Sequence, residues 1–223
     1  MQGRMQERAA SALRICSAMV CGLLSAALVF ANRQASIFEV EIACQRSKGS
    51  LRVADLTVLG FEIGASSIRD VQKRFPGTTL VRLTNEEESE EGICLKDRGG
   101  MAVVLATGVF GAPDTLTGVY LAPVRLVESR RLHCRTVDLP EKAFSSASGI
   151  YVGAPARAVS LWARGRALTD GPFCAAFETP SKSGPLKLSK GKHVKELFDS
   201  TGIMGEIRDG KLEWVRIYGI AST

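Results

Sequence analysis

The cysteines are the residues of this chain whose chemistry is most distinctive. Six are present, and two of them, Cys16 and Cys21, lie in an apolar N-terminal stretch. The four that remain as candidate site residues are Cys44, Cys94, Cys134 and Cys174. Their wide spacing contains no C-x-x-C, so neither a zinc ribbon nor a thioredoxin-like motif is encoded locally. In an oxidising compartment these cysteines predict two disulfides, whereas in a reducing one they would be four buried thiols.

Four cysteines allow three pairings, and their positions along the chain favour one of them without excluding the others. Cys94 follows an acidic loop, and Cys134 follows the strands that come next, so a bridge between them would close the edge of one sheet. Cys44, on an apolar strand expected over residues 37–43, would then reach Cys174 and tie the two halves of the chain together.

The histidines give little support to nucleophilic catalysis, which needs an imidazole beside a serine or cysteine. His133 precedes Cys134 directly, but neighbours on a strand point to opposite faces, so this adjacency argues against contact. His193 lies in a lysine-rich stretch typical of a solvated surface. No G-x-S-x-G, H-E-x-x-H or phosphate-binding glycine loop occurs. The sequence therefore indicates no catalytic residue, no metal ligand and no cofactor.

Charged residues cluster at two places. Five carboxylates, those of Glu86, Glu87, Glu88, Glu90 and Glu91, lack the interleaved glycine of a calcium loop, so they predict a solvated loop. Basic residues gather at 130–135 and 182–195, where they would suit an anionic envelope surface or simply maintain solubility. Without residues 1–31, which hold three Arg and Glu7, the net charge falls from +6 to +4, and the basic residues are scattered among 22 acidic ones. This mild basic excess and an aromatic content of 6% argue against nucleic-acid binding.

The N-terminus has the pattern of a secretory signal peptide over residues 1–31. Three arginines precede the uncharged stretch 15–30, which ends at Val29-Phe30-Ala31. The stretch is shorter than the roughly 20 residues of a membrane span, so cleavage is expected, with Asn32 as the first mature residue. Cys21 lies inside the apolar run rather than after it, which excludes a lipoprotein. The predicted location is the periplasm or the medium, without a membrane span after cleavage. The alternative is tethering by an uncleaved anchor.

Two six-residue segments of similar sequence, called hexads below, indicate how the chain is organised. Gly60–Ala65 and Gly149–Ala154 share the pattern Gly-apolar-x-apolar-Gly-Ala, and each precedes an expected helix, at 66–75 and 155–164. Strands are expected at 78–83, 92–96, 101–107, 116–121 and 172–178, with a further helix at 193–200. A hairpin at 206–219 would turn at Asp209-Gly210.

Consecutive strands favour an α+β fold with two related repeats, each a helix plus an antiparallel meander, and with the helices packed on one face of the sheet. The expected divisions are 32–135, with the N-terminal strand and first repeat, and 136–223, with the second repeat and C-terminal hairpin. A parallel βαβ fold would need long crossovers that the chain lacks.

The hexad followed by a helix and a meander resembles the repeat of small bacterial envelope proteins related to the outer-membrane-assembly lipoprotein SmpA/OmlA and to beta-lactamase inhibitory protein. Residues 60–121 also resemble uncharacterised periplasmic proteins of proteobacteria. The resemblance implies this fold and a non-catalytic protein, and it implies no partner and carries over no binding residue. The signal, the repeat and the lack of catalytic residues predict an exported interaction or structural module of the bacterial cell envelope, for which an envelope protein is the candidate partner. The second class of function is a small exported hydrolase or a thiol/disulfide-active enzyme that uses one of the four cysteines.

Overall fold

The computed structural model describes residues 37–38, 42–47, 51–84, 90–108, 114–128, 132–139, 141–163, 168–180 and 198–220. They belong to one compact unit that runs from residue 37 to residue 223. The expected signal peptide, most of the acidic tract, the 182–195 basic stretch and His193 lie outside these residues.

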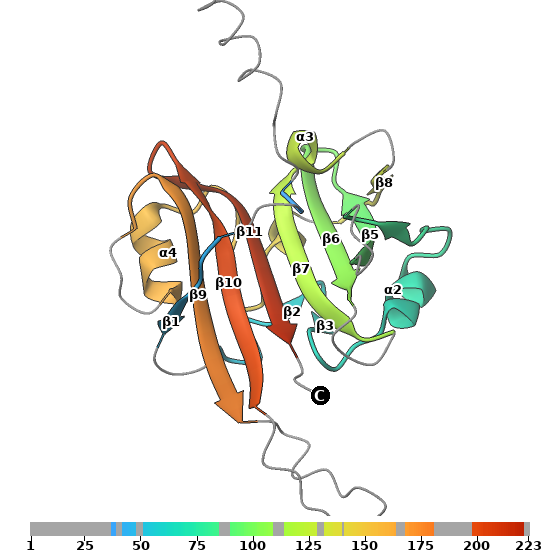
Figure 1. The fold of residues 1–223 in the computed structure, drawn as a ribbon. Coiled ribbons are helices and arrows are strands. Elements are labelled where there is room, and N and C mark those ends of the chain that lie inside the picture. Colours follow the sequence, from blue (N-terminus) through green and yellow to red (C-terminus); the bar gives the residue numbers. More distant parts are fainter. Residues whose placement is uncertain are drawn as a thin grey trace, which may run out of the picture. The chain divides into compact units, whose positions relative to one another are not determined.

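In the described part of the chain, nine strands form one sheet (Figure 1). From one edge the order is β1 (Gln45–Ser47), β9 (Gly171–Pro180), β10 (Phe198–Arg208), β11 (Lys211–Ile220), β7 (Leu116–Pro123), β6 (Met101–Thr107), β5 (Glu91–Lys96) and β4 (Val81–Arg82). The ninth strand, β8 (Arg135–Thr136), also pairs with β5. Two pairs are parallel, β1 with β9 and β8 with β5, and the other described pairs are antiparallel.

The central strands are apolar on both faces, which decides how the sheet is covered. In β6, Ala102 to Thr107 are all buried, and β7 is buried over most of its length. Strands with this composition need packing partners on both sides. Two separate clusters of buried hydrophobic residues result, with Val103 and Leu105 in the first and Ala102 and Val104 in the second.

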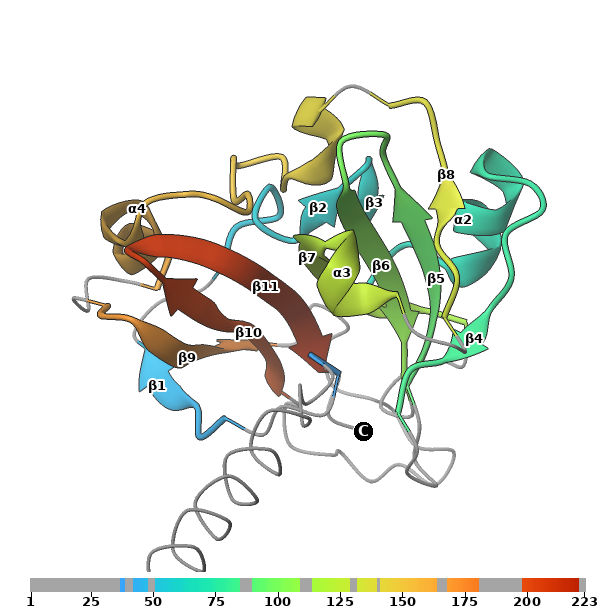
Figure 2. The ribbon, with the colours of Figure 1, turned by 90° about the horizontal axis from the view of Figure 1, so that it is seen from above.

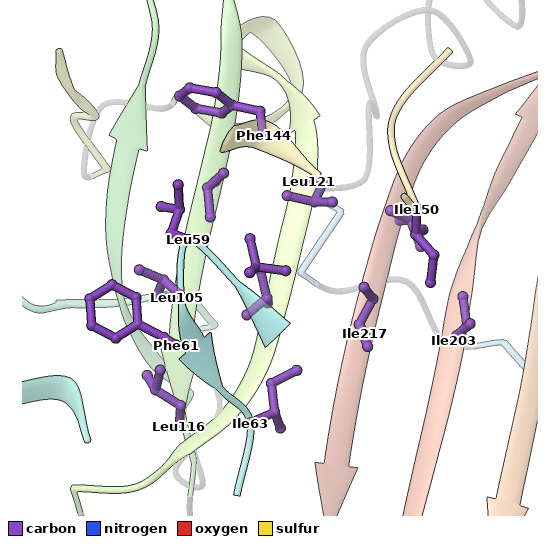
Figure 3. Packing of buried hydrophobic residues seen from close by; sticks show 14 of the residues in the cluster. Leu59, Phe61, Ile63, Leu105, Leu116, Leu121, Phe144, Ile150, Ile203 and Ile217 are labelled. Carbon is purple, nitrogen blue, oxygen red and sulfur yellow. The ribbon is translucent and has the colours of Figure 1, made fainter. Parts of the chain in front are cut away.

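Short elements supply the covering layers. The first cluster is closed by α2 (Ile68–Arg74), α4 (Ala156–Trp162), the 3-10 turn η1 (Glu141–Phe144) and the small hairpin of β2 (Thr57–Val58) and β3 (Phe61–Glu62). Figure 3 shows Leu59, Phe61 and Ile63 of this hairpin region beside Leu105 and Leu116 of the sheet. The second cluster includes Val127 of α3 (Val124–Val127) together with Ile37. Figure 2 shows the same layers from above.

The predicted α+β fold of helix-plus-meander repeats with helices on one face is wrong. The described chain forms one mixed, mostly β structure in which the two longest helices have 7 residues each, and α3 lies on the opposite face from α2 and α4. The physical reason is the two-sided burial of β6 and β7: a sheet that is apolar on both faces cannot leave one of them to solvent.

Within this sheet, the pairing is palindromic about the junction of β7 and β11. One row of directly paired residues runs through Cys94, Val104, Tyr120, Arg216, Met204 and Cys174. A register shift follows Ala106 in one half and Glu206 in the other, at corresponding places. At each end a short parallel strand follows a cysteine, β1 after Cys44 and β8 after Cys134. The two disulfides therefore occupy matching positions at opposite ends of the row.

The local predictions differ in outcome. Strands β5, β6, β7 and β9 lie close to their expected ranges, whereas β4 is reduced to Val81–Arg82. The expected strand at 37–43 is not formed by its described residues, and the strand there begins at Gln45. Phe198 to Ser200 belong to β10 rather than to the end of a helix, and residues 193–197 of that expected helix are outside the described residues.

The hexads place glycine where the backbone needs it. Gly64 has φ +83° and Gly153 has φ +89°, a region that side chains disfavour. The amide of each glycine donates to a carbonyl near the start of a long strand. Gly64 donates to Leu116 in β7, and Gly153 donates to Leu212 in β11. The helix after the first hexad is capped by Ser67, because the Ser67 hydroxyl accepts from the amide of Asp70 and the Asp70 carboxylate accepts from the amide of Ser67.

The hairpin between β10 and β11 turns at Asp209-Gly210, as the sequence predicts. Asp209 has φ +52° and Gly210 φ +69°, the positive values that a type I′ turn requires. Gly210→Val is expected to lower the free energy of unfolding by about 1 kcal/mol or more, because a β-branched residue is strained there. Asp209→Asn should leave stability unchanged, since asparagine tolerates this region. Urea denaturation measures both, and equal midpoints for Gly210→Val and the native protein would contradict the turn assignment.

Asp55 makes folding sensitive to acid. Burial raises its pKa, but hydrogen bonds from Ser148 and from the amide and side chain of Arg52 outweigh this and leave the pKa below its ordinary value of 3.8. A carboxyl with a lowered folded-state pKa contributes stability that is complete above pH 3.8 and is lost as the pH falls through the lower folded value. Asp55→Asn should therefore weaken the dependence of stability on pH below about pH 4. If urea denaturation gave the same dependence of stability on pH for Asp55→Asn and the native protein, the explanation would be wrong.

Candidate interaction surface

Among the described residues, large hydrophobic side chains are exposed at four positions: Val53, Leu80, Tyr151 and Leu161. Two of these belong to the region of α4. Leu161, in the last turn of the helix, is 75% exposed, and Tyr151, just before it, is 46% exposed. The Tyr151 ring meets Trp162 edge-on, with centroids 6.4 Å apart. We call Tyr151, Arg157, Leu161 and Trp162 the α4 surface.

The helix sequence explains why Leu161 faces solvent. Val159 and Ala163 are buried and lie one turn apart, so they set the face that packs on the first cluster. Leu161 falls between them in the sequence and therefore on the opposite side of the helix. The exposed Arg157 precedes it by one turn on that side. The helix thus offers an aliphatic side chain and a guanidinium together.

The chain segment that contains α4 has charged residues of one sign. Asp170 and Asp209 lie near the first residue of α4, because the Ala156 amide donates to the Gly210 carbonyl and the Gly210 amide donates to Asp170. The stretch from Lys142 to Thr169 contains four basic residues, Lys142, Arg157, Arg164 and Arg166, and no acidic one. In this stretch Arg157 lies on the helix itself, and it forms no ion pair among those described. An apolar side chain within a basic segment suits a partner that is apolar at its centre and acidic at its rim.

The cysteines are joined as their chain positions favoured, Cys44 to Cys174 and Cys94 to Cys134, with Cα atoms 4.5 Å apart in each pair. Three of the four are buried, and Cys44 is exposed. Glu128 supports the second bridge, because its carboxylate accepts from the Cys134 amide at 3.2 Å. A hydrogen bond from Lys96 lowers the pKa of Glu128 below its ordinary value, so this acceptor stays ionised at neutral pH.

An ion pair lies on the sheet at the centre of the palindromic row. The guanidinium of Arg216 contacts the Glu90 carboxylate and lies over the ring of Tyr120, 5.0 Å from its centroid. The Tyr120 hydroxyl donates to the other oxygen of Glu90 at 2.6 Å. Burial raises the pKa of Tyr120 well above 10.0, so the hydroxyl remains a donor. Because Glu90 is bound by both Arg216 and Tyr120, the arrangement holds strands β7 and β11 together rather than presenting a reactive group.

Glu90 and Glu91 therefore differ from the expected solvated loop. Glu90 is held by Arg216 and Tyr120, and Glu91 begins β5. The carboxylates at 86–88 lie outside the described residues. The role of Glu90 could not be predicted because its partners, Tyr120 and Arg216, lie far from it in the sequence. The available signal was a tyrosine with a polar hydroxyl within an otherwise apolar part of β7.

The remaining candidates do not converge on a reaction. His133 is exposed while the adjacent Cys134 is buried and bonded to Cys94. Among the described residues, no group of three or more His, Cys, Asp or Glu side chains could hold a metal ion. A hollow of about 280 Å³ lies beside Asp97, Arg98 and Asp138, where opposite charges are mixed in an open setting.

No family model, curated protein or solved structure matches the chain. Among the described residues, none of the helices has the length and apolar character needed to span a membrane. The two disulfides fit a protein of an oxidising compartment, either periplasmic or extracellular.

The α4 surface was not predicted from the sequence. In the helix expected at 155–164, Ala158, Val159 and Trp162 follow helical spacing, and Leu161 lies outside the apolar face that they define. A leucine placed outside the apolar stripe of a short helix is the signal that would have found it.

Proposed function

We propose that this chain is an exported, non-catalytic interaction module of the bacterial cell envelope that docks another envelope protein through its α4 surface. The observation that carries the proposal is the exposed Leu161, which lies beside an aromatic pair and Arg157 in a segment without acidic residues. A leucine at this exposure is worth explaining because most large apolar side chains here are buried. The partner we expect presents an apolar pocket for Leu161, flanked by carboxylates.

The fold supports a binding role for a second reason. Disulfides at both ends of the sheet hold the short edge strands in place, so the α4 surface rests on a stiff base. A preorganised surface loses little conformational freedom when it binds, which favours affinity. The compartment proposed here follows from the N-terminal pattern at 1–31, with cleavage after Ala31, and from the two disulfides.

Leu161→Ser is expected to weaken partner binding at least tenfold while changing stability by less than about 0.5 kcal/mol, because the side chain is exposed in the free protein. Val53→Ser is the matched control, since Val53 is 48% exposed but lies outside the α4 surface. It should change neither property. Equal binding by both variants would contradict the proposed site.

The partner is sought with a photo-crosslinking amino acid at position 161 in living cells, and at position 53 as the control. We expect an adduct with one exported protein from position 161 alone, and Arg157→Glu should reduce it strongly because it reverses the charge beside Leu161. Mass spectrometry identifies the crosslinked protein, which we expect to have carboxylates around the pocket that receives Leu161. Crosslinks mainly to lipid, or the same proteins from both positions, would refute the proposal.

A further inference from the structure

The two disulfides occupy matching register positions but differ in their surroundings. Cys94 and Cys134 are 3% and 7% exposed. At the other end of the sheet Cys174 is buried to a similar extent, whereas Cys44 is exposed. The Cys44–Cys174 bond therefore has one exposed residue, Cys44, whereas both residues of the matching bond are buried.

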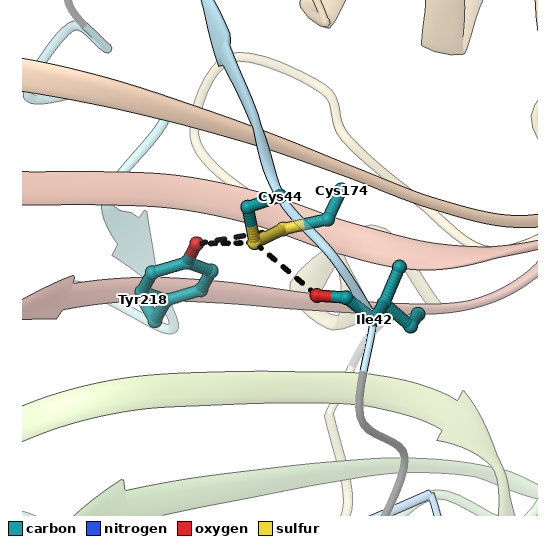
Figure 4. The surroundings of a disulfide bond; sticks show 4 residues. All are labelled: Ile42, Cys44, Cys174 and Tyr218. Atoms are coloured by element: carbon teal, nitrogen blue, oxygen red, sulfur yellow. Dashed lines mark hydrogen bonds between the residues drawn. A yellow bond between two sulfur atoms is a disulfide. The ribbon is translucent and has the colours of Figure 1, made fainter.

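A hydroxyl group lies against this disulfide. The oxygen of Tyr218 is 3.3 Å from Sγ of Cys44 and 3.5 Å from Sγ of Cys174 (Figure 4). Burial raises the pKa of Tyr218 above 10.0, so the hydroxyl keeps its proton at neutral pH and can donate to sulfur. Arg216 lies over the same ring, 5.4 Å from its centroid, and adds positive charge nearby.

The sheet is built to let Tyr218 reach the disulfide. Gly202 is the direct partner of Tyr218 in β10, and a Cβ atom there would collide with the tip of the tyrosine ring. In the other half of the sheet the corresponding pair is Ala102 with Ala122. The shielded disulfide therefore has neither the hydroxyl nor the glycine beside it.

We propose that Cys44–Cys174 is a thiol–disulfide exchange site, at which the thiolate of an exported protein or small thiol attacks the sulfur of Cys44. A bond forms between the incoming sulfur and Sγ of Cys44, and the Sγ–Sγ bond to Cys174 breaks. The Cys174 sulfur leaves with the electron pair as a thiolate, which accepts a hydrogen bond from the Tyr218 hydroxyl and later takes a proton from water. No net oxidation occurs, because one disulfide replaces another. The inference stands whether or not the α4 surface binds a partner.

Limited reaction of the oxidised full chain with reduced glutathione tests this site. Mass spectrometry after acid quenching should find glutathione on Cys44, with Cys174 free, and the Cys44–Cys174 bond should open at least tenfold faster than Cys94–Cys134. Tyr218→Phe keeps the ring and removes the hydroxyl, so it should slow the opening of Cys44–Cys174 about five- to tenfold, which is the effect of one hydrogen bond of ordinary strength.

Gly202→Ala is the second variant, because it retains the hydroxyl but displaces the ring tip, and it should slow the same bond. Cys94–Cys134 is the internal control in each sample, since global unfolding would expose both bonds together. Opening of the two bonds at one rate, glutathione found mainly on Cys174, or a native rate in both variants would overturn the proposal.

Discussion

Replacing Cys44 and Cys174 together with serine is expected to lower the free energy of unfolding by about 5 kcal/mol, and replacing Cys94 and Cys134 by about 4 kcal/mol. The first bond links residues 130 apart and the second residues 40 apart, so the first removes more conformational entropy from the unfolded chain. Whole domains are stable by only about 5–15 kcal/mol, so each loss is a large part of the total, and the first double variant should be the less stable of the two.

Urea denaturation of the mature protein under non-reducing conditions measures both losses. Cys94→Ser alone should leave a titratable thiol at Cys134, whereas the double variant at 94 and 134 should have none. Equal stability of the native protein and both double variants would show that the bonds do not constrain the unfolded chain.

Gly205→Ala is expected to destabilise the protein by about 3 kcal/mol, the upper part of the range for overpacking. A Cβ atom on Gly205 would collide with the backbone carbonyl of Trp214 in the paired strand and press on the ring of Phe173. A backbone oxygen within a ladder cannot move aside as a flexible side chain can, so the strands themselves would have to separate.

Gly118→Ala is the control for this effect. Gly118 is also a buried strand glycine, in β7, but a Cβ there would meet its nearest atom, the Ile217 carbonyl oxygen, at an ordinary 3.5 Å. Its midpoint in urea should stay near that of the native protein. An equal shift of the urea midpoint in Gly118→Ala and Gly205→Ala would contradict the collision at Gly205.

Local signals identified much of the sheet. The C-terminal hairpin was predictable because Asp209-Gly210 fits the positive φ values of the turn, and β6 was predictable because an uninterrupted apolar run marks a buried strand. The same apolar run also indicates that β6 is covered on both faces. Burial of consecutive residues in β6 requires cover on both faces, and this excludes helices confined to one face.

The short edge strands of the sheet could not be predicted from their amino-acid sequence. Strand β1 has three residues and β8 has two, both largely exposed, so neither shows the alternation that identifies a strand. Their places are marked instead by the cysteines that precede them. The pairing of β7 with β11 joins segments far apart in the chain, and local propensity contains no information on which strands become neighbours.

The candidate site was less predictable than the fold. The cysteine pairs are the ones that chain position favoured among three possibilities, but the exposure that separates Cys44 from the others depends on which strands surround it. Tyr218 reaches the disulfide only because a glycine lies opposite it in β10. Predicting such a contact requires the pairing register of β10 with β11, which the sequence alone does not determine.

Peptide mapping without reduction, on protein isolated from the compartment to which cells deliver it, tests most directly that this is an exported module held by two disulfides. Thiols are blocked by alkylation before lysis, and linked peptides are then identified by mass spectrometry. We expect a mature chain beginning at Asn32, with one fragment linking Cys44 to Cys174 and another linking Cys94 to Cys134. Four alkylated cysteines in a chain that still begins at Met1 would contradict it.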